Sequence, residues 1–144
     1  MEFFYFDSAH AIEVHDVIIS KSGGISGIKD IGLLYSVLEL IQNDDYYGSL
    51  EEKVTHLCYS INKNHAFNDG NKRASIALST YLLEINGWDF KINRFIIEME
   101  NIAVDIADNR IDKELLVEIV TSILFEDEYS EYLKLKIIYA KGGI

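Results

Sequence analysis

The side chains best able to do chemistry are concentrated in one stretch, His65–Arg73, which reads His-Ala-Phe-Asn-Asp-Gly-Asn-Lys-Arg. An apolar run, Ala74–Ile85, follows it, so the end of the stretch is expected to open a helix. A helix N-terminus presents free backbone N–H groups and a partial positive charge. Lys72 and Arg73 add two full charges at the same place. The stretch therefore predicts an anion site, with phosphate as its natural ligand.

His65 and Asp69 could supply proton transfer and metal binding at this site. A neutral imidazole can take a proton from a hydroxyl nucleophile near neutral pH. Asp69 follows four residues later in the predicted loop, where a carboxylate could hold Mg²⁺ between nucleotide phosphates, because this ion needs few protein oxygens. The same spacing also fits a solvent-exposed turn with an acid that caps a helix. Spacing alone leaves both interpretations open.

The other polar residues of the stretch surround the predicted anion site. Gly70 permits tight backbone geometry beside a ligand, and Asn71 can offer an amide. Lys72 and Arg73 would neutralise charge on a transferring phosphoryl group, and this reaction needs mainly positioning and such an electrostatic clamp. Asn68 would help to shape the loop. The sequence contains no Walker loop, Rossmann glycine pattern or zinc-binding helix.

Composition excludes several classes of protein. The 144 residues are enough for one domain with a real core. A net charge of −11 argues against a general nucleic-acid binder, which needs a basic face. No apolar run approaches the roughly 20 residues of a membrane span, and the N-terminus lacks the basic region of a signal peptide. The single cysteine, Cys58, excludes an intrachain disulfide and a zinc site built on cysteines. We therefore expect a cytoplasmic protein with no membrane or direct nucleic-acid partner.

The hydrophobic pattern predicts an all-α domain of about six helices. The expected helices begin at Asp7 or Ser8, Asp30, Ser49, Asn71, Asn93 and Asp112. Ser49 and Glu52 form a capping box, and the fourth helix is apolar nearly all round, which places it at the centre of the bundle. We expect one domain over residues 1–127. Residues 128–144 form an extension that could be a helix, a strand or a tail.

Two parts of the chain together resemble one known family. His65–Arg73 is similar to the signature of the Fic/Doc family, His-Pro-Phe-x-(Asp/Glu)-Gly-Asn-Gly-Arg-x-x-Arg, and especially to its Doc (death on curing) branch. Doc proteins have Lys in place of the second Gly, as at Lys72, and Ile76 stands where the distal Arg of Fic enzymes would be. Gly23–Gly27 and the following Asp30–Leu34 resemble the Doc region between the first two helices. The resemblance covers almost the whole predicted domain.

The resemblance implies the compact helical Fic/Doc fold and an ATP-dependent transferase that uses Mg²⁺. Doc-type toxins transfer the γ-phosphate of ATP to a hydroxyl of elongation factor Tu, which halts translation, and a Phd-like antitoxin neutralises them. If the roles of the family residues are carried over to this chain, His65 is the general base on a Thr or Ser hydroxyl, Asp69 binds Mg²⁺, and Phe67 packs into the core. The expected catalytic residues are His65, Asp69, Lys72 and Arg73. The residues expected to bind ATP are Asn68, Gly70, Asn71, Lys72 and Arg73.

Two departures from the Fic pattern favour phosphate transfer over nucleotide transfer. Lys72, in place of a Gly, takes up room beside the helix end and adds charge. Ile76, in place of an Arg, removes a second side chain that could bind phosphate. We therefore expect the γ-phosphate, and not the α-phosphate, to face the acceptor. Two alternatives stay open, namely Fic-type protein adenylyl transfer (AMPylation) and a catalytically inert module that binds an antitoxin. The intact His65 and Asp69 speak against the inert module.

Three weaker signals lie outside the signature. Tyr46 and Tyr47 occupy a polar loop that we expect near the site, where they could belong to the flap that docks the target in Fic relatives. Ser122–Glu126 weakly resembles the inhibitory helix of some Fic enzymes, but the Arg that it would pair with is replaced by Ile76, so we expect no self-inhibition of that kind. His15 lies next to an aspartate without further metal ligands, and we interpret it as helix surface or core packing.

Overall fold

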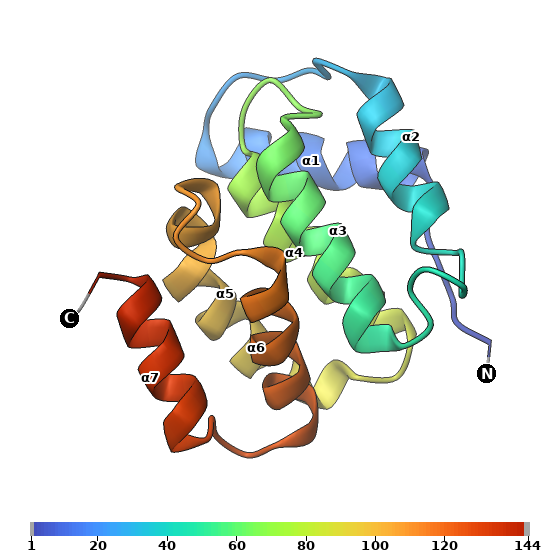
Figure 1. Ribbon diagram of the computed structural model, residues 1–144. Helices are drawn as coiled ribbons and strands as arrows, with labels where there is room; N and C mark the ends of the chain where they lie inside the picture. The colour runs from blue at the N-terminus through green and yellow to red at the C-terminus, as the bar shows by residue number, and fades with distance from the viewer. Residues whose placement is uncertain (1, 143–144) are drawn as a thin grey trace.

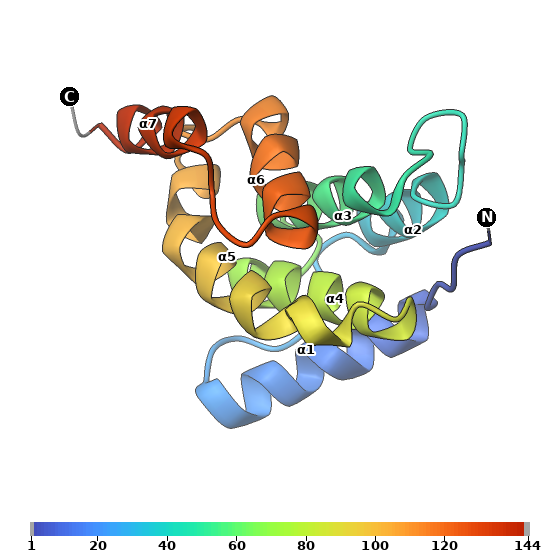
Figure 2. The same ribbon diagram turned by 90° about the horizontal axis from the view of Figure 1, so that it is seen from below.

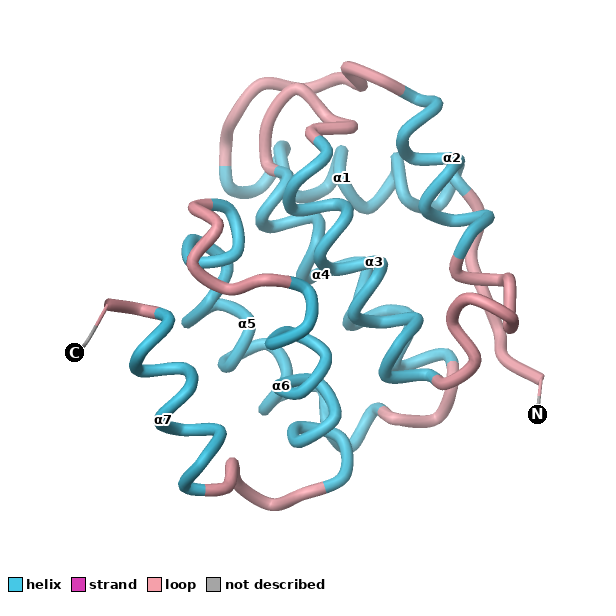
Figure 3. The backbone as a smooth tube through the Cα atoms, in the orientation of Figure 1, coloured by secondary structure: helices cyan, strands magenta, loops and turns pink. Residues whose placement is uncertain are grey.

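The computed structural model describes residues 2–142, and this part of the chain is helical without a β-strand (Figures 1 and 3). Its elements are α1 (Ser8–Ser22), α2 (Ile31–Leu40), α3 (Leu50–Asn64), α4 (Asn71–Ile85), the 3₁₀ helix η1 (Asp89–Lys91), α5 (Ile92–Ala107), α6 (Lys113–Phe125) and α7 (Glu131–Ala140). The predicted all-α fold is confirmed. No described helix is both long and apolar enough to cross a membrane.

The α3–α4 hairpin forms the centre of the bundle. Seen from below in Figure 2, α4 lies between α1 and α3, and it also packs against α5. α3 in turn packs against α2, α5 and α6. Both helices bury a continuous apolar stripe, with Leu57 and Ile61 on α3 and Leu78 and Leu82 on α4 fully buried. The expected central position of the fourth helix is confirmed, although α3 shares it. The loop between the two helices is therefore attached to the most deeply packed part of the molecule.

Local capping rules explain where most helices begin. The Asp7 carboxylate accepts a hydrogen bond from the His10 backbone N–H at 3.0 Å, and Asp112 accepts one from Leu115 at 2.8 Å. The predicted capping box of Ser49 is present at the start of α3. The expected start of the fifth helix at Asn93 is wrong. α5 already begins at Ile92, without a side-chain cap, because η1 leads directly into it.

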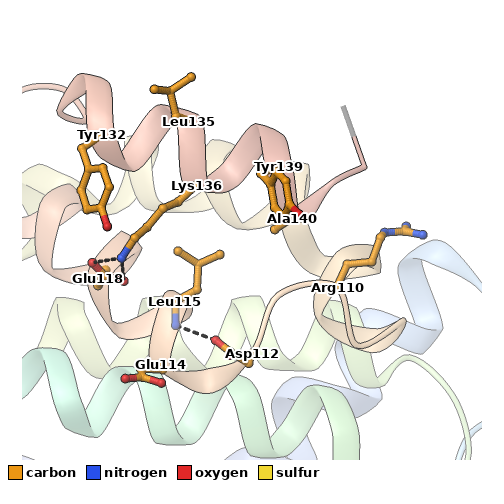
Figure 4. Close-up of a pocket in the computed structure, with 10 residues that line it drawn as sticks. All are labelled: Arg110, Asp112, Glu114, Leu115, Glu118, Tyr132, Leu135, Lys136, Tyr139 and Ala140. Carbon is orange, nitrogen blue, oxygen red and sulfur yellow. Dashed lines mark hydrogen bonds and ion pairs between the residues drawn. The ribbon is translucent and has the colours of Figure 1, made fainter. Parts of the chain in front are cut away.

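Residues 131–140 of the C-terminal extension form a helix, α7, which packs against α6. Leu133 is buried there, and the Lys136 ammonium lies 3.0 Å from the Glu118 carboxylate of α6. Figure 4 shows Lys136 reaching across to Glu118 at a surface cavity of about 860 Å³ that also includes Leu115 and Tyr132. Of the three forms left open for this extension, the structure has the helix.

Candidate active site

The loop that joins α3 to α4 turns through two left-handed residues. α3 ends at His65, whose φ of 55° and ψ of 44° lie in the left-handed region that a residue other than glycine seldom adopts. The side chain of Asn64 stabilises the turn by accepting a hydrogen bond from the Ala66 N–H at 3.1 Å. α4 starts after Gly70, which has a φ of 74°. Backbone strain at a non-glycine residue is typical of functional sites.

The connection between α1 and α2, residues 23–30, lies beside this loop, as the upper part of Figure 1 shows. The carbonyl of Ala66 accepts hydrogen bonds from the N–H groups of Lys29 and Asp30, at 2.8 and 3.0 Å. The N–H of Asn68 donates to the Gly27 carbonyl at 3.1 Å, and its side-chain amide donates to the Ser26 carbonyl at 3.2 Å. Asn68 therefore joins the two loops through hydrogen bonds to the α1–α2 connection.

His65 and Lys72 are the two signature side chains left free for a ligand. Both are exposed, and neither the His65 ring nor the Lys72 ammonium has a hydrogen bond or ion pair within residues 2–142. They flank the start of α4, one at the end of α3 and the other in the first turn of α4. A free imidazole and a free ammonium at one helix end can accept a proton and attract a phosphate.

The first turn of α4 has no side-chain cap, so its leading backbone N–H groups are not satisfied by a side chain. No acidic residue occupies this turn, whereas Lys72 and Arg73 add positive charge to the positive end of the helix dipole. Such an arrangement does not stabilise the helix and favours an anion from outside the chain.

Asp69 is held as an ionised carboxylate at the edge of this helix end. Its Oδ2 accepts a hydrogen bond from the Ile25 N–H at 3.0 Å, and its Oδ1 accepts one from the Gly70 N–H at 2.8 Å. These two bonds, with the charge of Arg73 adding to them, hold the pKa of Asp69 below its ordinary value. Each oxygen keeps a further lone pair for another partner.

Mg²⁺ usually keeps several waters and is held by one or two carboxylates together with the phosphates of a bound nucleotide. Residues 2–142 contain no cluster of three or more His, Cys, Asp or Glu side chains that could hold a metal alone. Asp69 lies next to the uncapped start of α4, so its carboxylate fits a Mg²⁺ ion that a bound nucleotide would bring with it.

Arg73 points to the α1–α2 connection. Its Nη1 donates hydrogen bonds to the Ser22 hydroxyl and, at 3.0 Å, to the Gly23 carbonyl. Gly24 makes this approach possible, because a Cβ there would lie 2.6 Å from Asp69 Oδ2 and 3.1 Å from Arg73 Nη2. The guanidinium therefore contributes its charge to the site while its hydrogen bonds fix the neighbouring loop.

The side chain of Asn71 stabilises the loop that joins α3 to α4. Its Oδ1 accepts a hydrogen bond from the Phe67 N–H at 3.2 Å, and its Nδ2 donates to the Phe67 carbonyl at 3.1 Å. The residue is buried and its carboxamide is committed to the loop, while its backbone N–H is one of the leading N–H groups of α4 that no side chain caps. Phe67 is fully buried, as expected.

His15 is part of the site, a role that its resemblance to the first helix of Doc proteins did not by itself predict. Its ring stacks on Phe67 with a centroid distance of 3.9 Å and an interplanar angle of 5°, and its Nε2 lies 2.6 Å from the Asp69 carbonyl oxygen. The interpretation of His15 as a packed residue is right. Its contact with the signature depends on the packing of α1 against α4, which periodicity along α1 does not show.

One expectation about a neighbouring segment needs correction. Tyr47 stacks on His56, which lies in the middle of α3, about 14 Å along the helix from His65. Tyr46 and Tyr47 are therefore not beside the signature. Glu126 follows α6 at the other end of the bundle, where the adjacent Phe125 packs on Trp88 beyond the C-terminus of α4. Ser122–Glu126 therefore lies away from the start of α4.

Comparison with known proteins supports the assignment made from the signature. A family model described as Fic/DOC family matches residues 5–83, more than half of the chain. A protein named Toxin Doc from Mycolicibacterium smegmatis is 33% identical over 94 residues, which cover 58% of this chain and 72% of that protein. Protein kinase doc of Escherichia phage P1 is 31% identical over 80 residues, which cover 53% of this chain and 63% of the phage protein. With the signature placed at the start of α4, the chain belongs to the Fic/DOC family.

Proposed function

We propose that this protein is a toxin that transfers the γ-phosphate of ATP to a Thr or Ser hydroxyl of a translation factor, with elongation factor Tu as the expected target. The observation that carries the proposal is the uncapped start of α4, which carries the exposed Lys72 and follows the ionised Asp69, on the loop that begins at His65. The name of the phage relative, Protein kinase doc, supports phosphate transfer as the reaction class.

His65 would act as the general base. Its imidazole accepts the proton of the acceptor hydroxyl while the oxygen forms a bond to the γ-phosphorus. The bond from that phosphorus to the bridging oxygen breaks, and ADP leaves. The backbone N–H groups of Asn71 and Lys72 and the Lys72 ammonium stabilise the charge on the transferring group. The left-handed turn places His65 at the C-terminal end of α3, where its side chain is exposed.

Asp69 would hold Mg²⁺, which neutralises phosphate charge when it is bound with ATP. Because Ile25 and Gly70 each donate a hydrogen bond to one carboxylate oxygen, the carboxylate is already ionised and oriented before the nucleotide arrives. This pre-organisation lowers the cost of assembling the site. Arg73 would act at longer range, through its charge and through the loop that it anchors.

An antitoxin of the Phd kind would control the toxin. An apolar groove of about 620 Å³ lies next to Arg73 between α1, α4 and α5, and its lining includes Val17, Ile18, Ile76 and Ile96. A disordered apolar segment could fold into such a groove on binding. Ile76 contributes to this groove where Fic enzymes carry the distal Arg, so an apolar contact would replace a charge pair there.

Transfer of label from ATP to protein tests the proposal. The purified chain is incubated with a ribosome-free extract and with ATP labelled at either the γ- or the α-phosphate, and labelled proteins are identified. We expect γ-label on a translation factor and none in a His65→Asn variant. Incorporation of the α-label would mean AMPylation. No label from either ATP, with growth arrest unaffected by the same substitution, would support an inert binding module and contradict the proposal.

A further inference from the structure

His15 of α1 makes an unusual contact with the loop of the signature. The side chain is 1% exposed, and its ring stacks on Phe67 while its Nε2 lies 2.6 Å from the carbonyl oxygen of Asp69. A carbonyl oxygen can only accept, so Nε2 carries the proton and donates it. One buried side chain thus contacts both the aromatic anchor of the loop and the peptide that follows Asp69.

The peptide between Asp69 and Gly70 needs such a restraint. Gly70 has a φ of 74°, in the region where glycine is not strained, so the peptide before it can rotate more easily than a peptide between two bulky residues. The N–H of this peptide, on Gly70, donates a hydrogen bond to Asp69 Oδ1. Its carbonyl oxygen, on Asp69, accepts one from His15 Nε2. A cation at Asp69 Oδ1 would compete with the Gly70 N–H for this oxygen, whereas the bond from His15 to the Asp69 carbonyl would be unaffected.

We propose that His15 is a positioning residue of the phosphotransfer site, whose Nε2–H fixes the orientation of the Asp69–Gly70 peptide. This orientation aims the Asp69 carboxylate and the first N–H groups of α4 at the same point. The proposal rests on the proposed function for its catalytic consequence, while the positioning itself is a property of the folded chain.

Two substitutions separate the hydrogen bond from the ring stack. His15→Phe keeps an aromatic ring against Phe67 and removes the donor. His15→Gln removes the ring and keeps an N–H donor at a similar distance from the backbone. His10→Phe is the matched control, because His10 also lies on α1 against aromatic rings, 4.2 Å from the Tyr81 centroid, but contacts no residue of the signature loop. Circular dichroism and thermal unfolding establish that all three variants are folded.

The first readout is transfer of γ-label from ATP, with kcat and KM for ATP measured separately. We expect His15→Phe to lower kcat by roughly 10- to 100-fold, since small misplacements at a reacting centre have effects of this size. His15→Gln should retain activity within a few-fold, and His10→Phe should match the wild type. Wild-type activity in His15→Phe, or an equal loss in the folded Gln variant, would overturn the role of the hydrogen bond.

The second readout does not depend on activity. Amide hydrogen exchange of Ile25 and Gly70, which both donate to the Asp69 carboxylate, should be faster in His15→Phe than in the wild type or in His10→Phe. Amides in the core of α6 should exchange at unchanged rates. If the wild type transfers no phosphate, the proposed function fails, yet faster exchange at these two amides would still support His15 as a positioning residue. Unchanged exchange at both would overturn it.

Discussion

The starts of α3 and α4 follow opposite rules, although the two helices have the same length and pack against each other. α3 begins with the Ser49 capping box and carries Glu51 and Glu52 in its first turn, an arrangement that satisfies the helix end and matches the helix dipole. α4 begins after Gly70 without a side-chain cap, and its first turn carries Lys72 and Arg73. The start of α3 is therefore stabilised by its own side chains. The start of α4 lacks such side chains and is suited to binding a ligand.

The largest expected effect is a loss of activity when His65 of the signature is replaced. His65→Asn removes the proposed base but keeps a residue that tolerates the left-handed turn. Phosphate transfer should fall by about 10²- to 10⁴-fold, as for loss of a general base, with little change in unfolding temperature. Single-turnover transfer from γ-labelled ATP measures the effect, and His10→Asn serves as the control. Activity within a few-fold of the wild type would remove His65 from its proposed role.

At Lys72 we expect a smaller loss of activity, together with a gain in stability. Lys72→Glu gives the start of α4 the kind of charge that α3 already has. The free energy of unfolding should rise by about 0.3 to 1 kcal/mol through the helix dipole, while the dissociation constant for ATP should rise at least tenfold.

Calorimetric titration with magnesium–ATP and urea unfolding measure these two quantities for Lys72→Glu. Lys91→Glu makes the same charge change beside the start of α5, the other α-helix without a side-chain cap, and should leave ATP affinity unchanged. Equal loss of affinity in both variants would mean that net charge, and not the α4 site, attracts the nucleotide.

At the start of α3 the expected effect is on stability alone. Ser49→Ala removes the capping box and should lower the free energy of unfolding by about 1 kcal/mol. Specific phosphate transfer by the folded fraction should not change, because this end lies about 22 Å along α3 from His65. Urea unfolding and activity assays on the same preparation test this, and a selective loss of activity would contradict the division between the two ends.

The smallest expected effect concerns acid sensitivity at His56, in the middle of α3. Burial, with the charge of Lys113 adding to it, lowers the pKa of His56 to about 4 from its ordinary 6.5. Between these values the unfolded chain binds a proton that the folded chain does not, so this contribution to stability is complete above pH 6.5 and is lost as the pH falls toward 4.

His56→Phe should flatten this part of the stability curve in urea unfolding across the same pH range. The losses below about pH 3.8 should remain, because they arise from carboxylates with lowered pKa values such as Asp105. A curve for the variant with the original slope between pH 6.5 and 4 would show that another group is responsible.

Local rules predicted the features that depend on neighbours in sequence. Asp7, Ser49 and Asp112 cap helices where their spacing from apolar residues predicts caps. The signature and the apolar run after it predicted an anion site at the start of α4. These features need only the helical period and the chemistry of a helix end.

Contacts between distant segments could not be predicted in this way. The carboxamide of Asn71 was expected to face a ligand, but it binds Phe67, and Arg73 binds the end of α1. His15 reaches Asp69 across 54 residues. Tyr47 was expected near the site, yet it stacks on His56 in the middle of α3, about 14 Å along the helix from His65. Each of these results depends on how α1, α3 and α4 pack, which a single sequence does not encode locally.

The central claim is that the start of α4 receives the phosphates of ATP. Titration of the ¹⁵N-labelled protein with magnesium–ATP, followed by amide NMR, tests it directly. We predict the largest shifts at the amides of Asn71, Lys72 and Arg73, with none at Leu50, Glu51 and Glu52 in the corresponding turn of α3. Shifts absent from the first turn of α4, or centred on another part of the molecule, would contradict the claim.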